Sequence, residues 1–382
     1  MKIAIFSKHE KSTGTVNIRC LQLIEYLELL GIESSFSLIY QAIPLRRSDY
    51  FILHRVNFDR YTQRFISCAK EFNVPLIYDT DDLLFEQIYD RKKGENTNYL
   101  SQSFLKSMQA CDAVTVSTKF LQQQASKYHP RVYLMRNALS SSFLEKSDLI
   151  FNKRKYRNSK YTVMAYLSGS NSHNEDFLEI IDSLKRVLEK NKYCKLLVVG
   201  PLTYDGSHFD CFKDRFEHRE KIPYKYYHSI FEEIDINLVP LVLNDFSHSK
   251  SEIKFIEAAA SGVPSIASPS LAYKDVIDNG VNGFLCESKE EWFRTMDLLV
   301  NNLDLRQRIG VTARSLVINE YSPEARSKDL ARLFNNLDTS IGGSIKNISW
   351  RLLSLQASLG ITIFIRSTKS WVNKVLNDFQ LK

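Results

Sequence analysis

The sequence of 382 residues has no run of about 18 apolar residues, which is the length that a membrane-spanning helix needs. Its start, MKIAIFSKHE, holds only a short apolar stretch followed by charge, which is not typical of a signal peptide. The six cysteines are scattered and form no Cys-x-x-Cys pair, so neither a zinc site nor a disulfide framework is indicated. We therefore expect a cytoplasmic protein.

Acidic residues are scarce at the C-terminal end. The formal charge is +7, and residues 341–382 carry +5 of it, so that only +2 remains for residues 1–340. One arc of about 80° on a helical wheel collects the apolar side chains Ile345, Ile348, Leu352, Leu355 and Leu359. Basic amphipathic segments that carry tryptophan, here Trp350 and Trp371, can lie in a membrane interface. The alternative is a helix that packs onto the protein or a dimer partner.

Predicted strands and helices alternate along residues 1–338 in two series. Between the two series, residues 150–160 hold five basic residues and no acidic one, which is typical of a linker or surface loop. The pattern predicts an α/β protein with two Rossmann-like, doubly wound domains. We place these domains at residues 1–145 and 158–338, followed by a basic helical tail over 339–382.

A predicted helix over residues 250–261 carries the clearest functional signal. At about 100° per residue, Lys250, Lys254, Glu257 and Ser261 share one stripe of roughly 60° on an otherwise apolar surface. Two cations near a helix N-terminus suit a phosphate, and a carboxylate two turns further along suits a sugar diol. The alternative is a solvated helix with a Lys–Glu pair at i, i+3, which is common and contributes only a few tenths of a kcal/mol.

The stretch KFIEAAASGVPSIAS, followed by Tyr273 and VIDNGVNGFL, resembles the donor-site segment of retaining GT-B glycosyltransferases of family 4 (group 1). The resemblance covers roughly residues 1–338. It implies the GT-B fold, in which donor and acceptor bind the cleft between two domains, and a nucleotide-sugar donor whose ribose is bound by Glu257. The longer signature of the family has an earlier glutamate as well, and Ser249 stands at that position here.

Three carboxylates follow a predicted strand at Tyr78-Asp79-Thr80-Asp81-Asp82, where α/β sheets bind their ligands. The segment resembles the YD-x-DD of GT-B enzymes for bacterial surface polysaccharides, which implies an acceptor-binding or catalytic role for Asp79, Asp81 and Asp82. One alternative is a polar turn that caps the next helix. Another is the D-x-D nucleophile of haloacid-dehalogenase-type phosphatases, although the Gly-Thr step of that family is absent. A metal-binding D-x-D is possible by composition, but GT-B enzymes generally need no such metal, so we expect neither metal nor cofactor.

The loop after the first strand of the second domain begins with Gly169 and Ser170, and the helix behind it offers an N-terminus to an anion. The segment resembles the SG-x-x-x-H-x-x-DF of the same polysaccharide-linked subset. This implies that His173 donates to a phosphate oxygen or acts as a weak acid on the leaving group. The alternative is a solvated histidine beside a helix cap.

Further donor contacts are expected from both domains. Gly14 and Arg19 follow the first strand of the first domain and can approach the diphosphate, while Tyr224 lies where related enzymes hold the nucleotide base. Core packing is the alternative for this tyrosine. The donor site that we expect comprises Gly14, Arg19, Gly169, Ser170, Tyr224, Lys250, Ser251, Lys254 and Glu257.

These features predict a glycosyltransferase that moves a sugar from a nucleotide-diphosphate donor, with retention, to a saccharide acceptor. The subset resemblance implies surface-polysaccharide assembly, such as lipopolysaccharide O-antigen or capsule, with a polyprenyl-linked acceptor at the inner face of the cytoplasmic membrane. The alternative is a non-catalytic GT-B-like subunit that binds a partner glycosyltransferase or a glycan. Nucleic-acid binding is not expected, because the basic residues gather in the tail and linker rather than along an aromatic face.

Overall fold

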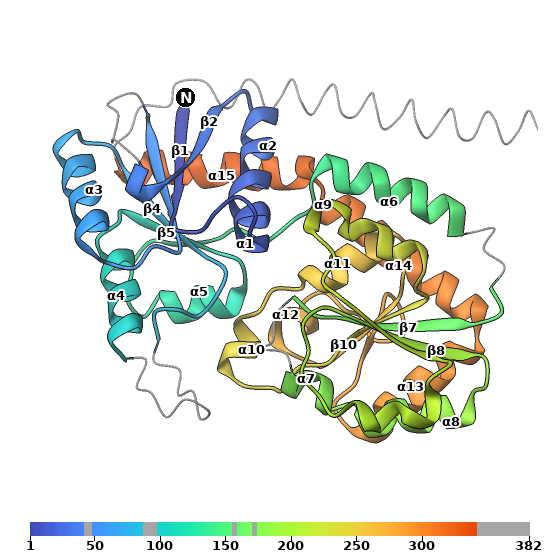
Figure 1. The fold of residues 1–382 in the computed structure, drawn as a ribbon. Helices are drawn as coiled ribbons and strands as arrows, with labels where there is room; N and C mark the ends of the chain where they lie inside the picture. The colour runs from blue at the N-terminus through green and yellow to red at the C-terminus, as the bar shows by residue number, and fades with distance from the viewer. Residues whose placement is uncertain (42–47, 87–97, 155–158, 170–173, 342–382) are drawn as a thin grey trace, which may run out of the picture.

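The computed structural model describes residues 1–41, 48–86, 98–154, 159–169 and 174–341 (Figure 1). These residues form two domains, each built on a six-stranded parallel sheet with helices on both faces. The prediction of two Rossmann-like domains is confirmed. Within the described residues, no helix is both long enough and apolar enough to cross a membrane.

The N-terminal sheet has the strand order β2-β1-β3-β4-β5-β6. Its strands are β1 (Lys2–Ser7), β2 (Glu33–Leu38), β3 (Tyr50–His54), β4 (Leu76–Thr80), β5 (Ala113–Val116) and β6 (Val132–Leu134). The helices around it are α1 (Gly14–Val16), the π-helix η1 (Asn17–Leu21), α2 (Gln22–Leu29), the 3₁₀-helix η2 (Ile39–Gln41), α3 (Arg60–Glu71), α4 (Asn98–Gln109) and α5 (Lys119–Ala125). The order of strands reverses between β1 and β3, and parallel sheets bind ligands beside the carboxyl ends at such a reversal.

The C-terminal sheet has the order β12-β11-β10-β7-β8-β9, which is the Rossmann order with its reversal between β7 and β10. Its strands are β7 (Thr162–Leu167), β8 (Cys194–Val199), β9 (Phe216–Arg219), β10 (Ile236–Val239), β11 (Ser265–Ala267) and β12 (Phe284–Leu285). Its helices are α6 (Ser141–Arg154), α7 (Asn174–Leu178), α8 (Ile181–Lys190), η4 (Gly206–Phe212), α9 (Tyr224–Tyr227), η5 (His228–Glu232), α10 (Asp245–Ser249), α11 (Ile253–Ala260), α12 (Leu271–Lys274), α13 (Lys289–Asn301) and α14 (Leu303–Glu320).

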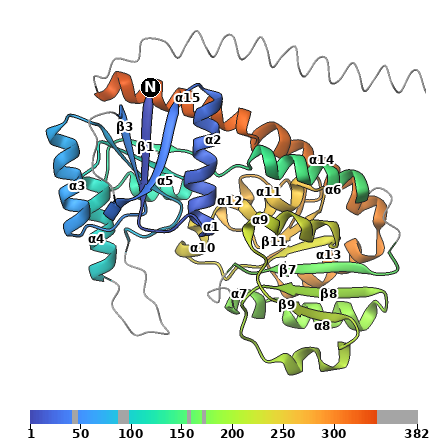
Figure 2. The same ribbon diagram turned by 45° about the horizontal axis from the view of Figure 1, so that its top comes forward.

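Two helices join the domains. The chain first crosses between β6 and α6, and α6 packs on the C-terminal domain through Phe143 and Ile150. It crosses back after α14, and α15 (Pro323–Ile341) lies against α2 of the N-terminal domain, as Figures 1 and 2 both show. Leu330 and Phe334 of α15 belong to the same core as Leu27. The divisions expected at residues 145 and 338 therefore fall inside helices, α6 and α15.

The helix that the sequence predicts from Lys250 is shorter in the structure. A capping box at Asn244 starts the separate short helix α10, and Lys250, which follows α10, has extended backbone. Helix α11 begins only at Ile253. At its other end, Gly262 adopts a left-handed conformation, φ +69°, as expected for a glycine that terminates a helix. Lys250 thus lies just before α11 rather than on it.

Candidate active site

Helix α11 presents a buried Lys–Glu pair near the reversal of the C-terminal sheet. Asn237 of β10 donates from Nδ2 to the carbonyl oxygen of Lys254, which ties the helix to that strand at 3.2 Å. The Glu257 residue is 4% exposed, and its carboxylate makes no hydrogen bond or ion pair within the described residues. The ammonium nitrogen of Lys254 is also buried, and it has no hydrogen-bond partner among the described residues. It lies 5.3 Å from the centre of the Tyr166 ring.

Burial acts on both charges of this pair. It raises the pKa of Glu257 to about 8, against the opposing effect of the Lys254 ammonium. It lowers the pKa of Lys254 to about 8, although Asp176 and Glu257 oppose the shift. A buried polar group without a partner costs about 1–3 kcal/mol, so such groups are mostly found where function requires them. The pair has the chemistry to bind a ligand with an anionic part and a hydroxylated part.

Aromatic residues border the pair on the side of the N-terminal domain. The rings of Tyr224 and Tyr227 stack with centres 6.3 Å apart, and burial together with the Glu257 carboxylate raises the pKa of both phenols. Gln22 of α2 donates from Nε2 to the hydroxyl oxygen of Tyr224 at 3.1 Å. Tyr224 therefore lies near Glu257 and also contacts the other domain. Its contact with a nucleotide base stays a prediction.

The first predicted carboxylate of the N-terminal domain is fully engaged inside the protein. Asp79 is 1% exposed, and Arg19 donates to both of its oxygens, from Nε at 3.1 Å and from Nη2. Thr115 adds a hydrogen bond from its hydroxyl at 2.7 Å. Arg19 was predicted to bind the donor and Asp79 to take part in catalysis. Here the two side chains neutralise each other in the interior.

The second carboxylate, Asp81, lies in a polar cluster at the ends of β1, β3 and β4. Thr15 donates to its Oδ2 at 3.0 Å, and the guanidinium of Arg55 lies 3.5 Å from its Oδ1. Burial acts to raise the pKa of Asp81, but Arg55 and His54 hold it well below its ordinary value. Arg55 has left-handed backbone, φ +50°, which is uncommon for a residue with a side chain and is often found at functional sites.

The third carboxylate, Asp82, joins the two domains. It accepts a hydrogen bond from Arg55 and another from Lys250 Nζ of the C-terminal domain at 2.7 Å. The Lys250 ammonium also lies 4.1 Å from the centre of the Phe246 ring. The structure thus brings the YDTDD segment to the start of α11, through Asp82 and Lys250, which are 168 residues apart in sequence.

The structure describes some of the remaining predicted residues and not others. Gly14 begins α1, and a Cβ atom added there or at Gly169 would meet no atom within 4 Å. The carbonyl oxygen of Gly169 accepts a hydrogen bond from Lys221 at 2.8 Å. Ser170 and His173 lie outside the described residues. Ser249, at the position of the family's earlier glutamate, is buried and donates to the carbonyl oxygen of Phe246 at 2.6 Å.

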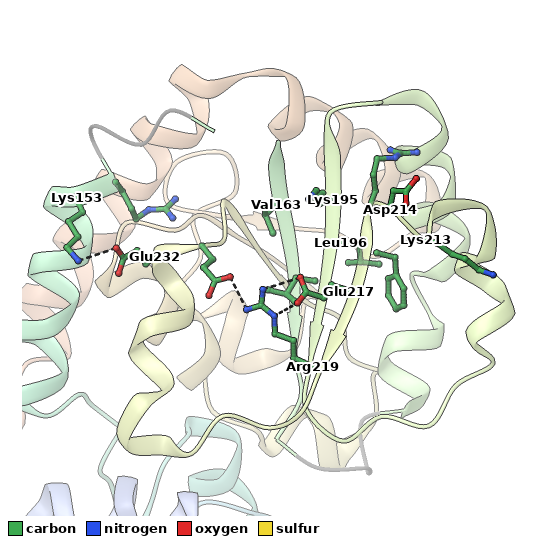
Figure 3. A pocket seen from close by; sticks show the side chains of 14 residues that line it. Lys153, Val163, Lys195, Leu196, Lys213, Asp214, Glu217, Arg219 and Glu232 are labelled. Carbon is green, nitrogen blue, oxygen red and sulfur yellow. Dashed lines mark hydrogen bonds and ion pairs between the residues drawn. The ribbon is translucent and has the colours of Figure 1, made fainter. Parts of the chain in front are cut away.

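A cavity of about 740 Å³ lies over the starts of β7, β8 and β9, on another part of the C-terminal domain (Figure 3). Its charged side chains are largely paired with one another: Arg219 contacts Glu217 and Glu233, and Lys153 contacts Glu232. No cluster of three or more His, Cys, Asp or Glu side chains suited to a metal ion occurs in the described part of the chain. Within the described residues, the Lys254 ammonium of α11 is one of the buried polar groups without a hydrogen-bond partner.

Comparisons with known proteins agree with this architecture. Residues 177–332, which include α11, match the family model described as glycosyl transferase-like. A sequence search of curated proteins found no match. Among solved structures, HepE of Anabaena in complex with UDP superposes with a TM-score of 0.62 at 14% identity, over 88% of this chain and 100% of that chain. Sucrose-phosphate synthase of Thermosynechococcus elongatus gives 0.63 at 14% identity, over 89% and 99%. A glycosyltransferase of Rickettsia africae gives 0.56 at 14% identity, over 88% and 98%.

The chain has the GT-B glycosyltransferase fold. At these identities the likeness concerns the fold alone, and the residues of the site rest on their own geometry. In a GT-B fold the two domains face each other across the substrate site. The Asp82–Lys250 contact and the Gln22–Tyr224 contact both join these two domains.

The sequence analysis missed several residues of this region. His54 ends β3 and Arg55 follows it, so their position at a strand terminus, like that of Asp79, is the signal that could have identified them. Arg136 and Asn137 carry no such signal, because they lie on the first domain crossing. The contacts of Arg136 and Asn137 depend on how the two domains pack against each other, which one sequence does not show.

Proposed function

We propose that this protein is a glycosyltransferase that moves a sugar from a nucleoside-diphosphate donor, with retention, to a saccharide acceptor in bacterial surface-polysaccharide assembly. The observation that carries the proposal is the buried Lys254–Glu257 pair, unpartnered within the described residues, beside the β7/β10 reversal. A Rossmann-type sheet binds nucleotides at this reversal.

Each group of the pair has a place in such a donor site. The Glu257 carboxylate accepts hydrogen bonds from the two ribose hydroxyls, and Lys254 with Lys250 neutralises the diphosphate. Cations placed where charge develops on the departing diphosphate stabilise the transition state, which is usually a large contribution to catalysis. Ser251, Gly169 and Ser170 are further donor contacts in this proposal, as are Gly14 and Tyr224.

The structural relatives support a nucleotide donor. HepE was crystallised with UDP and also with UDP-glucose, which fits a site of this kind in the same fold. The acceptor side of the proposal rests on Asp81 and Asp82, which follow strand β4, and Asp82 contacts Lys250 just before α11. His173 is proposed to donate to a phosphate oxygen or to act as a weak acid on the leaving group. We do not include Asp79 on the acceptor side, because its oxygens are occupied by Arg19 and Thr115.

The C-terminal tail is proposed to bring the enzyme to its acceptor. Residues 342–382 lie outside the described residues, and their sequence is basic and amphipathic. Such a segment suits an anionic membrane surface and a polyprenyl-linked acceptor. Deletion of 342–382 is expected to abolish sedimentation with vesicles that contain anionic lipid. Unchanged sedimentation would disprove the role of the tail and leave the donor site unaffected.

A non-catalytic GT-B-like subunit is the second candidate. Ser249 in place of a glutamate favours it, since the hydroxyl of Ser249 is used inside its own helix. Proton NMR of the protein incubated with nucleotide-sugars and saccharide acceptors separates the two candidates. The proposal predicts release of nucleoside diphosphate and a product with the anomeric configuration of the donor. An inverted product would contradict retention, and no turnover with any donor would favour the subunit.

A further inference from the structure

Four consecutive residues just before helix α11 each contact the N-terminal domain or the first domain crossing. We call Ser249–Glu252 the contact segment. Each residue has a different partner. Thr118 Oγ1 donates to the Ser249 carbonyl oxygen at 3.4 Å, and Lys250 Nζ donates to Asp82 Oδ1 at 2.7 Å. Asn137 Nδ2 donates to Ser251 Oγ at 2.8 Å, and Arg136 Nη1 donates to Glu252 Oε1 at 2.8 Å. The stretch that leads into α11 is therefore held at every residue by the N-terminal domain or by the first domain crossing.

Both domain crossings meet at the last residue of the contact segment. Glu252 is fully buried and accepts hydrogen bonds from Arg136 of the first crossing and from the Tyr321 hydroxyl of the second, the latter at 2.7 Å. The crossings also bond to each other, from the backbone N–H of Leu139 to the carbonyl oxygen of Tyr321 at 3.0 Å. Because these segments connect the domains, a change in domain arrangement must act on Glu252 and on the helix that it begins.

Asn137 extends this connection into the N-terminal domain. Its side chain is 4% exposed, its Oδ1 accepts from Arg19 Nη1 at 3.0 Å, and its Nδ2 donates to Ser251. Since a guanidinium can only donate, Arg19 fixes the amide orientation, and the amide N–H must point at Ser251. Arg19 is itself held by Asp79. A buried chain of contacts thus runs from Asp79 through Arg19 and Asn137 to Ser251.

We propose that Asn137 is a positioning residue for the donor site and that it acts through Ser251 on the first turn of α11. The proposal rests on the proposed donor site in one respect, namely that α11 carries the nucleotide contacts. It gives Asp79 and Arg19 a role that neither was expected to have: they orient Asn137 rather than touch a substrate. Ser251 is then held by Asn137 whether or not it also contacts the donor.

A double-mutant cycle on Asn137→Ala and Ser251→Ala tests this mechanism, with binding of UDP, GDP, dTDP and CDP measured by calorimetry. Asn137→Ala should weaken binding by roughly threefold to tenfold, equivalent to about 0.7–1.4 kcal/mol. Added to Ser251→Ala, it should weaken binding no further. Ser251→Thr keeps the hydroxyl and should retain affinity. Lys289→Ala, which removes an exposed ion pair with Asp182 away from the contact segment, is the control without effect. Additive effects of the two alanine variants would overturn the proposal.

Hydrogen exchange of the ligand-free protein gives a second, independent readout. The N–H groups of Phe255 and Ile256 bond to the carbonyl oxygen of Glu252, so loosening of the contact segment exposes them first. Asn137→Ala and Ser251→Ala should both speed exchange of these amides several-fold. Ser251→Ala leaves the Arg19–Asp79 pair intact. If Asn137→Ala does not fold, exchange in the Ser251→Ala protein still tests the proposal. Unchanged exchange would overturn the positioning role.

Failure of the wild-type protein to bind any diphosphate would overturn the proposed function. Hydrogen exchange would still decide whether Asn137 positions the contact segment.

Discussion

At the scale of single residues, the site is defined by which charges have partners. Asp79 and Arg19 satisfy each other in the interior, whereas Glu257 has no hydrogen bond or ion pair within the described residues. The sequence analysis assigned Asp79, Arg19 and Glu257 to one site. Residue type and position, at a strand end or on one face of a helix, do not show which charged side chains pair with each other. The lysine and glutamate of α11 could be predicted from their spacing. The pairing of Arg19 with Asp79, 60 residues apart, could not.

Replacement of Glu257 by Gln should stabilise the nucleotide-free protein, more at pH 8 than at pH 5. The pKa of Glu257 is raised from 4.5 to about 8, so folding takes up a proton between these values, and the contribution of the carboxyl to stability is lost as pH rises through that range. Removing the ionisable group should therefore raise the free energy of unfolding at pH 8, since a pKa difference of one corresponds to about 1.4 kcal/mol. Urea unfolding at both pH values measures this. Glu145→Gln, at an exposed position, is the control, and a less stable Glu257→Gln at pH 8 would contradict the account.

Replacement of Asp79 by Asn should destabilise the fold rather than remove only activity. Breaking a buried ion pair from one side leaves an uncompensated charge, here Arg19, at a cost of about 3–5 kcal/mol. Chemical unfolding measures the loss. Glu33→Gln breaks the exposed pair with Lys2 and should cost less than about 1 kcal/mol. An Asp79→Asn protein of wild-type stability without activity would instead assign Asp79 to catalysis.

At the scale of secondary-structure elements, the alternation of strands and helices could be predicted from hydrophobic runs and glycine stops. The start of α11 could not, because the capping box at Asn244 forms a second helix that ends at Ser249. Nor could the packing of α14 against the end of α11, since it depends on a glycine whose role appears only in three dimensions. A Cβ atom added to Gly310 would lie 2.1 Å from the carbonyl oxygen of Gly262.

Replacement of Gly310 by Ala should therefore separate α14 from the end of α11. Helix propensity favours alanine by up to about 1 kcal/mol, but the clash is with backbone, which has little freedom to move. Overpacking of this kind costs about 1–3 kcal/mol, so the net change should be destabilising. Thermal unfolding measures it, with Gly206→Ala as the control, because Gly206 has no atom within 4 Å of an added Cβ. A Gly310→Ala protein as stable as wild type would show that the two helices can move apart freely.

At the scale of the whole molecule, the two GT-B domains contact each other through the predicted site. The two-domain architecture could be predicted from the sequence, but the contacts between domains could not, since Asp82 and Lys250 carry no mutual signal in a single chain. Their ion pair has a consequence for ligand binding. Asp82 forms an ion pair with the Lys250 ammonium, which we propose also binds the diphosphate. The Asp82 carboxylate and the ligand therefore compete for Lys250.

Replacement of Asp82 by Asn should accordingly tighten binding of the nucleoside diphosphate by roughly threefold to tenfold, equivalent to about 1 kcal/mol. The amide keeps the shape of the side chain and removes its negative charge. Calorimetry on the variant tests this, and the Lys289→Ala protein again controls for the loss of an unrelated exposed ion pair. Weaker binding in Asp82→Asn would mean that Asp82 holds Lys250 in place for the ligand.

The central claim is that the buried pair on α11 binds a nucleoside diphosphate. Thermal stabilisation by UDP, GDP, dTDP and CDP tests it most directly, on the wild-type protein, Glu257→Ala and the exposed control Glu145→Ala. A ligand present at a hundred times its dissociation constant adds about 2.7 kcal/mol to the stability of the folded state. The account predicts that at least one diphosphate stabilises the wild-type and control proteins and not Glu257→Ala. Stabilisation that persists in Glu257→Ala, or no stabilisation of the wild type by any of the four, would contradict it.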